Sequence, residues 1–220
     1  MQTMTSHSAS ASFWDRIARK YAQQPIKDQA AYEEKLAYLR KLLKASDHVL
    51  EIGCGTGSTA LRIAPNVAHI TATDISPIMI EIAEAKLGTK SPGNVTFQTA
   101  DAADMIASHP FDAVCAFSLL HLVDDASHAM RRIREQLKPG GLFISKTVAL
   151  KNANVLWRVV LPILRLLGFA PRVVAFSTED LHRLLKTEGF EIVETRFFGK
   201  GRMNPMIVAR RTAPSDSTGR

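Results

Sequence analysis

The chain has 220 residues, 46% of them hydrophobic, so it can bury one sizeable core and is expected to form a single domain over residues 13–211. The two cysteines, Cys54 and Cys115, exclude a disulfide framework and a Cys/His zinc motif, and they favour a reducing cytoplasm. The net charge of +7 comes from residues 146–220, which hold 13 basic and 6 acidic residues, whereas residues 1–145 hold 15 of each. This excess predicts a solvated basic face, or attraction to an anionic substrate, a membrane surface or nucleic acid.

The N-terminal part is expected to be a disordered arm followed by helices. Residues 1–12 are rich in Ser, Thr and Ala, and they lack the basic start and apolar stretch of a secretory signal. Apolar residues then recur at helical spacing over 13–21 and 28–43, with a break at Gln24-Pro25.

From residue 49 onward, short apolar runs alternate with helical patterns. We expect strands over residues 49–52, 68–73, 95–99, 111–117 and 142–148. We expect helices over 57–63, 77–87, 102–107 and 124–137, and a turn at Lys138–Gly141 before the fifth strand. Strands separated by helices of this length predict an α/β fold, in which a parallel sheet is covered on both faces.

Residues 153–176 interrupt this alternation with an apolar helical insertion. Residues 155–174 contain no acidic residue, but they contain Pro162, Pro171 and three arginines spaced by seven. An arginine near the centre costs about 2.5–3.5 kcal/mol in a membrane span, so a spanning helix is disfavoured. The segment is instead expected to be a lid over the substrate, a peripheral membrane contact, or a helical hairpin packed on the core or at a dimer interface.

The chain is expected to end with a helix and two strands. Ser177-Thr178-Glu179-Asp180 is typical of a helix start, and the helix should run to about Lys186. Residues 190–198 and 206–210 are expected to be strands, and their short connection makes them antiparallel neighbours. Residues 212–220 are expected to be a disordered tail.

The segment His48–Ser58 predicts a buried strand that runs into a glycine turn and opens a helix. A dinucleotide fingerprint would place its third glycine where Ser58 stands, and a P-loop would need a lysine that this turn lacks. The third glycine is instead Gly57. The result is a flat turn without side chains, whose backbone can lie close against a small ligand.

Polar residues follow the other expected strands at the edge where open parallel sheets bind ligands. Asp74 comes 21 residues after Gly53, and its carboxylate can accept hydrogen bonds from both hydroxyls of a ribose or cap the next helix. Asp101 could accept from an exocyclic amine such as that of adenine while the Ala102 N–H serves a ring nitrogen, or Asp101 could cap a helix. Ser118–His121 follow the fourth strand.

Together with the segments 99–101, 111–114, 120–122 and 137–141, the glycine turn and Asp74 resemble the successive motifs of the class I S-adenosylmethionine (SAM)-dependent methyltransferases. The resemblance is to small bacterial members related to the ubiquinone- and menaquinone-biosynthesis enzymes, and it is close over residues 45–148. It implies a Rossmann-like sheet of seven strands, the last antiparallel, flanked by helices. In such families the N-terminal helices close over the cofactor, which makes Trp14, Tyr21 and Tyr32 candidates for that role.

The resemblance also implies a set of cofactor-binding residues. The glycines would flank the methionine part of SAM, Glu51 would hold the turn near the methionine amino group, and Asp74 would bind the ribose. Ile75 and Met79 would lie against adenine, whose edge Asp101 and Ala102 would read. The full expected set is Glu51, Gly53, Cys54, Gly55, Gly57, Asp74, Ile75, Met79, Asp101, Ala102 and Ser118.

These motifs predict methyl transfer to a small, apolar or amphipathic acceptor, with Leu119, His121 and the insertion lining the acceptor side. His121 is a candidate general base because an ordinary histidine titrates near neutrality, although its role could be structural. Cys54 is interpreted as a small residue of the turn. His109, His128 and His182 lack the spacing of a metal site, so no metal is expected.

Three other functions remain open. The basic C-terminal third favours an RNA or DNA methyltransferase, but the chain lacks an Asn/Asp-Pro-Pro-aromatic signature and an aromatic-interleaved basic stripe. Because every motif serves the cofactor, a SAM-binding protein without turnover is also possible. The position of Gly57 disfavours a nicotinamide oxidoreductase. The protein is expected to be cytoplasmic and to be a monomer or a homodimer.

Overall fold

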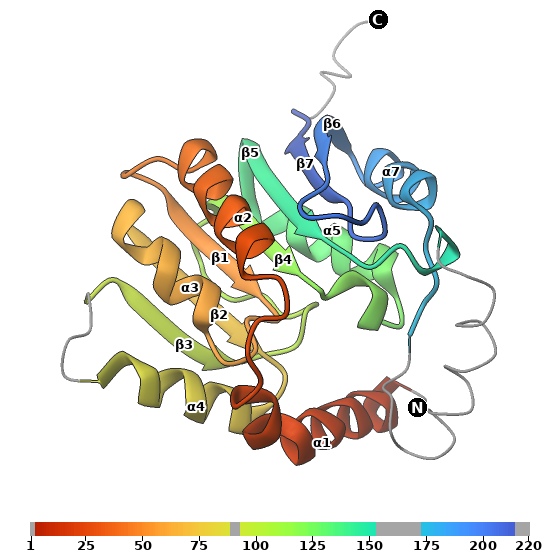
Figure 1. The fold of residues 1–220 in the computed structure, drawn as a ribbon. Coiled ribbons are helices and arrows are strands. Elements are labelled where there is room, and N and C mark those ends of the chain that lie inside the picture. Colours follow the sequence, from red (N-terminus) through yellow and green to blue (C-terminus); the bar gives the residue numbers. More distant parts are fainter. Residues whose placement is uncertain (1–2, 89–92, 153–172, 214–220) are drawn as a thin grey trace, which may run out of the picture.

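The computed structural model describes residues 3–88, 93–152 and 173–213. Its centre is a seven-stranded sheet with the order β3-β2-β1-β4-β5-β7-β6 (Figure 1). The strands are β1 (His48–Ile52), β2 (His69–Asp74), β3 (Val95–Thr99), β4 (Phe111–Phe117), β5 (Leu137–Lys146), β6 (Phe190–Arg196) and β7 (Met206–Arg211). The α-helices are α1 (Thr3–Ala22), α2 (Gln29–Leu42), α3 (Ser58–Ile63), α4 (Pro77–Leu87), α5 (Ala126–Gln136) and α7 (Thr178–Thr187).

The strand directions confirm the expected Rossmann-like architecture. β1 pairs in parallel with β2 and β4, and the parallel pairing continues to β3 on one side and to β5 on the other. β7, the last strand in the chain, is antiparallel to both β5 and β6. The carboxyl ends of β1 to β5 therefore share one edge of the sheet, where ligands bind in folds of this kind.

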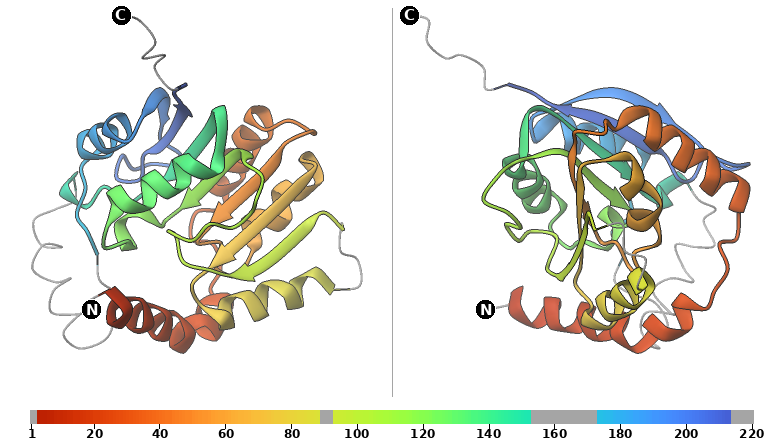
Figure 2. Two further views of the ribbon diagram at one scale, coloured as in Figure 1. Left: turned by 180° about the vertical axis from the view of Figure 1, so that it is seen from behind. Right: turned by 90° about the vertical axis from the view of Figure 1, so that its left-hand side faces the viewer.

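Two hydrophobic clusters lie on opposite faces of the sheet, as the alternation of side chains along a strand requires. Val49 of β1 packs in a cluster with residues of α2, α3 and α4, whereas the next residue, Leu50, packs with residues of α5 and α7. Figure 2 shows these helices covering the two faces. Because β1 and β4 are buried on both sides over most of their length, their sequences are mainly apolar, interrupted by Glu51 in β1 and Asp112 in β4, which is why they could be predicted.

The expectation of a disordered arm is wrong for residues 3–12, which belong to α1. This stretch contains neither glycine nor proline, so nothing in it interrupts the helix that continues through residues 13–22. The C-terminal half of α1 is fixed because Asp15 bonds to the start of α4. In Figure 1, α1 lies below the ends of β1 and β2.

The helix expected over residues 102–107 is absent, and that segment is a series of turns and bends. Side chains of α5 bind its backbone instead: Gln136 accepts from Ile106 N at 2.8 Å and donates to Asp104 O at 3.1 Å. Arg132 donates to Ala103 O at 3.1 Å. These bonds satisfy groups that a helix would have paired internally, so the loop is stable without one.

The Lys138–Gly141 segment is a bulge inside β5 rather than a turn before it. Leu137 pairs with Phe111 and Leu142 with Ala113, so four residues of β5 lie opposite one residue of β4, Asp112. The helix predicted from residue 177 is confirmed, since Ser177 and Asp180 form a reciprocal capping box at the start of α7.

The insertion predicted over residues 153–176 lies mostly outside the described residues, so its lid, membrane and dimer interpretations remain predictions. Across the parts of the chain that the structure describes, no helix is long and apolar enough to cross a membrane.

Candidate active site

The glycine turn after β1 has a left-handed backbone at all three predicted glycines, with φ values of 68° at Gly53, 55° at Gly55 and 71° at Gly57. A Cβ at Gly57 would lie 2.6 Å from Cζ of Phe97, and one at Gly53 would lie 2.8 Å from Cδ1 of Leu119. A Cβ at Gly55 would meet only Cε1 of Tyr21, at 4.0 Å. Packing therefore requires a glycine at 57, whereas the contact at Gly53 is with the flexible end of Leu119, and Gly55 presents an open, side-chain-free face.

Asp74 lies beside this turn at the carboxyl end of β2. Its Oδ2 accepts from Gly55 N at 2.8 Å, and its Oδ1 accepts from Ser76 N at 3.0 Å. Burial raises the pKa of Asp74, while these backbone N–H groups oppose the shift. Each carboxylate oxygen has a second lone pair, so the side chain can still accept from a ligand hydroxyl. The glycine turn and Asp74, which follows Gly53 by 21 residues in the sequence, are therefore in direct contact through the hydrogen bond from Gly55 N.

Lys86 of α4, which sequence reasoning missed, fixes the other side of the turn. Its Nζ donates to Thr56 O at 2.8 Å, to Thr56 Oγ1 at 2.7 Å and to Ser58 Oγ at 3.1 Å. These bonds hold the segment between Gly55 and the start of α3. The lysine lies 30 residues from Thr56 in the chain, so no local pattern could have predicted the contact.

Helix α1 covers the turn from outside the sheet. Tyr21 lies over Gly55, and its ring contacts Trp14 edge-to-face with a centroid distance of 6.4 Å. Asp15, another residue that the sequence did not reveal, accepts from Ser76 Oγ at 2.5 Å and from Ile78 N at 3.3 Å. The structure therefore brings Trp14 and Tyr21 to the site. Tyr32 is placed on α2, within 3.4 Å of Thr59 Oγ1.

Glu51 is buried at the end of β1, 2% exposed, with a buried lysine near it. Burial raises the pKa of Glu51 to about 7, and the charge of Lys35 opposes the rise. Lys35 of α2 is itself only 5% exposed, and burial lowers its pKa to about 8. Sequence analysis overlooked Lys35, although it follows Ala31 and precedes Leu39 by four residues each, on the buried face of the helix.

Cys54 and the predicted adenine contacts lie around the turn and Asp74. Cys54 is half-buried, and burial raises the pKa of its thiol well above the ordinary value, so it is a poor nucleophile. Ile75 is half-buried, whereas Met79 is buried in the first turn of α4. Asp101 accepts from Ala103 N at 3.0 Å, and Ala102 packs against the cluster on the α5 face.

The segment after β4 brings two further predicted residues to the same edge. Ser118 has a φ of 55°, and its N–H donates to Lys146 O at the end of β5, at 2.6 Å. His121 lies in the short helix η3 (Leu120–Leu122). Burial lowers the pKa of His121 to about 4, so the imidazole is neutral at pH 7 and a weak base.

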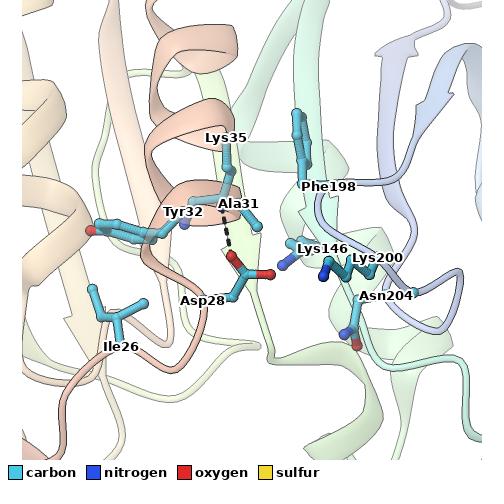
Figure 3. Close-up of a pocket in the computed structure, with 10 residues that line it drawn as sticks. Ile26, Asp28, Ala31, Tyr32, Lys35, Lys146, Phe198, Lys200 and Asn204 are labelled. Carbon is cyan, nitrogen blue, oxygen red and sulfur yellow. Dashed lines mark hydrogen bonds between the residues drawn. The ribbon is translucent and has the colours of Figure 1, made fainter.

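A cavity of about 280 Å³ opens beside this edge, between α2, the end of β5 and the loop from β6 to β7 (Figure 3). Three lysines line it, Lys35, Lys146 and Lys200, with Asp28 and Asn204. Lys35 connects the cavity to the cofactor edge, since its Nζ lies 3.4 Å from Thr59 Oγ1 of α3 and 4.3 Å from the centre of the Phe117 ring.

The residues present fit SAM. A bare glycine turn offers an open backbone face at Gly55, and a buried carboxylate able to accept ribose hydroxyls lies in contact with that turn. Tyr21 and Trp14 provide an apolar cover on the side away from the sheet. Phosphate-binding features are missing from this turn, because no lysine occurs within residues 53–58 and the third glycine comes at 57.

Comparison with known proteins agrees with this geometry. A family described as "Methyltransferase domain" matches residues 49–141. The chain is 32% identical over 194 residues to the demethylmenaquinone methyltransferase of Leptospira interrogans, covering 78% of this chain and 77% of that protein. It is 29% identical over 157 residues to the ubiquinone biosynthesis O-methyltransferase of Xylella fastidiosa, covering 61% of this chain and 63% of that protein.

Solved structures show the same fold. Magnesium protoporphyrin IX methyltransferase from Synechocystis, crystallised with bound S-adenosylhomocysteine (SAH), superposes with a TM-score of 0.69 at 20% identity, over 96% of this chain and all of that one. The [4+2]-cyclase SpnF also has a TM-score of 0.69 at 20% identity, over 86% of this chain and 83% of that one. The glycine turn, the strand order and the sequence similarity thus agree, and the chain belongs to the SAM-dependent methyltransferases related to the enzymes of ubiquinone and menaquinone biosynthesis.

Proposed function

We propose that this enzyme methylates a small, apolar or amphipathic acceptor that binds where β4 and β5 end. The observation that carries the proposal is the 280 Å³ cavity beside Lys146 and Phe117, which is sized for a small molecule or one end of a larger one. The relatives named as demethylmenaquinone and ubiquinone-biosynthesis enzymes support an acceptor of this size class.

In the proposed site, the chain's own residues hold and orient the methyl donor. Gly53, Gly55 and Gly57 flank the methionine portion of SAM, with Cys54 as a small residue of the turn. Glu51, at the end of β1, holds the turn near the methionine amino group. Asp74 accepts from the ribose hydroxyls. Adenine lies against Ile75 and Met79, with Asp101, Ala102 and Ser118 completing the pocket.

Bound SAM supplies an electrophilic methyl group on a sulfonium, and transfer to a hydroxyl acceptor leaves SAH and releases one proton. The protein's contribution is mainly to position the acceptor in line with the methyl group and to exclude water. His121 remains the candidate base at the end of β4. It is neutral and therefore able to accept a proton, but its burial makes it a weak acceptor until a substrate changes its surroundings.

The nucleic-acid alternative is disfavoured by where the basic side chains lie. Lys151 and Arg183 both bind Asp180, and Arg196 binds Glu194. Arg210 and Arg211 donate to backbone carbonyls of β5 and of α5. These cations are engaged locally, so they form no free stripe for a phosphate backbone among the described residues.

The test is a screen of acceptors with methyl-labelled SAM, covering quinols, phenols, thiols and lipid-like amines, with products identified by mass spectrometry. The proposal expects label in at least one small acceptor and none in RNA or DNA of any sequence. Because the fold also occurs in a [4+2]-cyclase, SAH binding must be measured separately. SAH binding without transfer to any acceptor would indicate a SAM-binding protein without turnover.

A further inference from the structure

The cavity beside the cofactor edge carries more positive than negative charge, because three lysines and one carboxylate line it. Lys35, Lys146 and Lys200 line it, whereas most of the other basic residues that the structure describes in the C-terminal third are bound to carboxylates or carbonyls. Among the described residues, Lys146 and Lys200 make no ion pair within 4.0 Å.

The carboxylates near these lysines, Asp28 beside Lys146 and Glu51 beside Lys35, cancel only part of their charge. Asp28 also lines the cavity, but its Oδ1 accepts from Ala31 N at 3.0 Å and caps the N-terminus of α2, whose positive end balances part of the charge. Glu51 lies behind Lys35 and does not line the cavity. An anion in the cavity would therefore find a positive field with few competing acceptors.

The three lysines approach the cavity from different elements. Lys35 projects from α2 and is held by the rings of Tyr32 and Phe117, whose centres lie 4.7 and 4.3 Å from its Nζ. Lys146 is the last residue of β5, and Figure 3 shows it pointing toward Asp28. Lys200 comes from the loop between β6 and β7, alongside Asn204, whose amide can donate a hydrogen bond.

The remaining wall of the cavity is apolar and aromatic. Tyr32, Phe198 and Ile26 line it, and Ile26 is 44% exposed. A ligand that fits both the lysine-lined side and the apolar wall of the cavity has a compact hydrocarbon or aromatic body and an anionic end. The Ser118 N–H bond to Lys146 O places this cavity next to the segment after β4, where the acceptor is proposed to meet the methyl group.

We propose that the methyl acceptor is a small organic acid, and that Lys146 and Lys200, with Lys35 behind them, bind its carboxylate in this cavity. The inference rests on the proposed function, because it names the substrate class of the same site. Recognition needs only that the lysine ammonium groups and the Asn204 amide donate to the carboxylate oxygens, while the apolar wall contacts the body of the acid.

The experiment measures binding by isothermal titration calorimetry to the full chain saturated with SAH. Two matched pairs serve as probes, 4-hydroxybenzoate against 4-hydroxybenzamide and octanoate against octanamide, because each amide keeps the shape and removes the charge. The variants are Lys146→Met and Lys200→Met, which keep side-chain length. Lys186→Met, on the exposed end of α7, is the control with the same change in net charge.

We expect at least one acid to bind roughly tenfold or more tightly than its amide, and each cavity variant to lose roughly tenfold in that acid's affinity. The amides, SAH and the Lys186→Met control should be unaffected. Acids that bind no better than their amides, or equal losses in Lys186→Met, would overturn the inference. Lys200 lies on an exposed loop, so its variant keeps the test decisive if Lys146→Met folds poorly.

Two further outcomes separate this inference from its premise. Inorganic phosphate is titrated alone, and if it binds as tightly as either acid, the site binds free anions and the organic-acid assignment is wrong. If SAH binds but acid and amide are equivalent, the acceptor class is wrong while the proposed methyltransferase stands. SAH is first titrated into the protein alone; if it does not bind, while the acids bind to the SAH-free protein through the lysines, the proposed function fails instead.

Discussion

Alanine substitutions at two of the turn glycines, Gly55 and Gly57, should separate folding from cofactor binding. In Gly57→Ala, the new Cβ would lie 2.6 Å from Phe97 Cζ and 2.8 Å from Ala83 Cβ at a φ of 71°. In Gly55→Ala, the φ of 55° is similarly unfavourable, but the nearest atom is Tyr21 Cε1 at 4.0 Å. The two variants thus share a backbone cost, and only Gly57→Ala adds a collision.

The expected magnitudes follow from these two contributions. A left-handed backbone costs about 1–2 kcal/mol for a non-glycine residue, and overpacking adds about 1–3 kcal/mol. We therefore expect the free energy of unfolding to fall by about 1–2 kcal/mol in Gly55→Ala and by about 2–5 kcal/mol in Gly57→Ala. Gly140→Ala, with a φ of 75° and no atom within 4 Å of the new Cβ, is the matched control.

Urea unfolding without ligand and titration with SAH provide the two measurements. Gly55→Ala should unfold like Gly140→Ala yet bind SAH roughly tenfold or more weakly, because its methyl group occupies the open face. Gly140→Ala should bind SAH normally. The reasoning is refuted if Gly57→Ala is no less stable than Gly140→Ala, or if Gly55→Ala retains full affinity for SAH.

Three other predictions concern buried charges and the cover of the site. Burial lowers the pKa of His121 to about 4, against about 6.5 when unfolded, so the unfolded chain binds the extra proton between these values. The contribution of His121 to the free energy of unfolding should therefore rise by up to about 3 kcal/mol from pH 4 to 6.5, measured by urea unfolding as the difference between the unaltered protein and His121→Asn; a difference that does not change with pH would contradict this. In Lys35→Met, the pKa of Glu51 should rise further above its unfolded value, so the contribution of Glu51 to stability should fall by about 1.4 kcal/mol per pH unit from pH 5 to 7. This contribution is the difference between Lys35→Met and Lys35→Met/Glu51→Gln, and equal pH slopes in the two variants would contradict the prediction. Asp15→Ala should remove the bonds to the start of α4, cost about 0.5–2 kcal/mol and speed tryptic cleavage within α1, and an unchanged cleavage rate would show that Asp15 does not fix the helix.

Much of the fold could be predicted because its local signals are strong. The bounds of α4 follow from Ser76-Pro77, since Ser76 caps the helix by accepting from Met79 N and proline fits the first turn. β4 (Phe111–Phe117) is apolar except for Asp112 and is mostly buried on both faces. In such segments the residue propensities, the periodicity of the apolar residues and the capping or turn residues at the ends all predict the same element.

The predictions that were wrong concern segments whose structure depends on contacts with residues far away in the chain. Residues 102–107 resemble a capped helix locally, but Gln136 and Arg132 of α5 bind their backbone. The N-terminal arm has a polar composition, and only its continuity with the anchored part of α1 makes it helical. The local amino-acid composition of these segments does not reveal such contacts.

In the candidate site, too, some residues could be predicted from local sequence rules, whereas others depend on contacts between distant parts of the chain. The position of Asp74 beside Gly55 followed from the rule that ligands bind at strand ends. Lys35 was missed because a lysine on a helix is normally solvated, and only the packed structure reveals its burial against Phe117 and near Glu51. The cavity proposed to bind the acceptor is lined by residues of α2, the end of β5 and the loop from β6 to β7, which lie far apart in the chain.

The most direct test of the donor site is titration of Asp74→Asn with SAH, beside Asp47→Asn as a control. Both aspartates accept a backbone N–H, Asp74 from Gly55 and Asp47 from Lys44, but Asp47 lies at the other end of β1. We predict that the unaltered protein binds SAH and not NAD, that Asp47→Asn binds SAH equally, and that Asp74→Asn loses roughly tenfold or more in affinity. Undiminished SAH binding by Asp74→Asn, or tighter binding of NAD than of SAH, would contradict the assignment of this edge as the methyl-donor site.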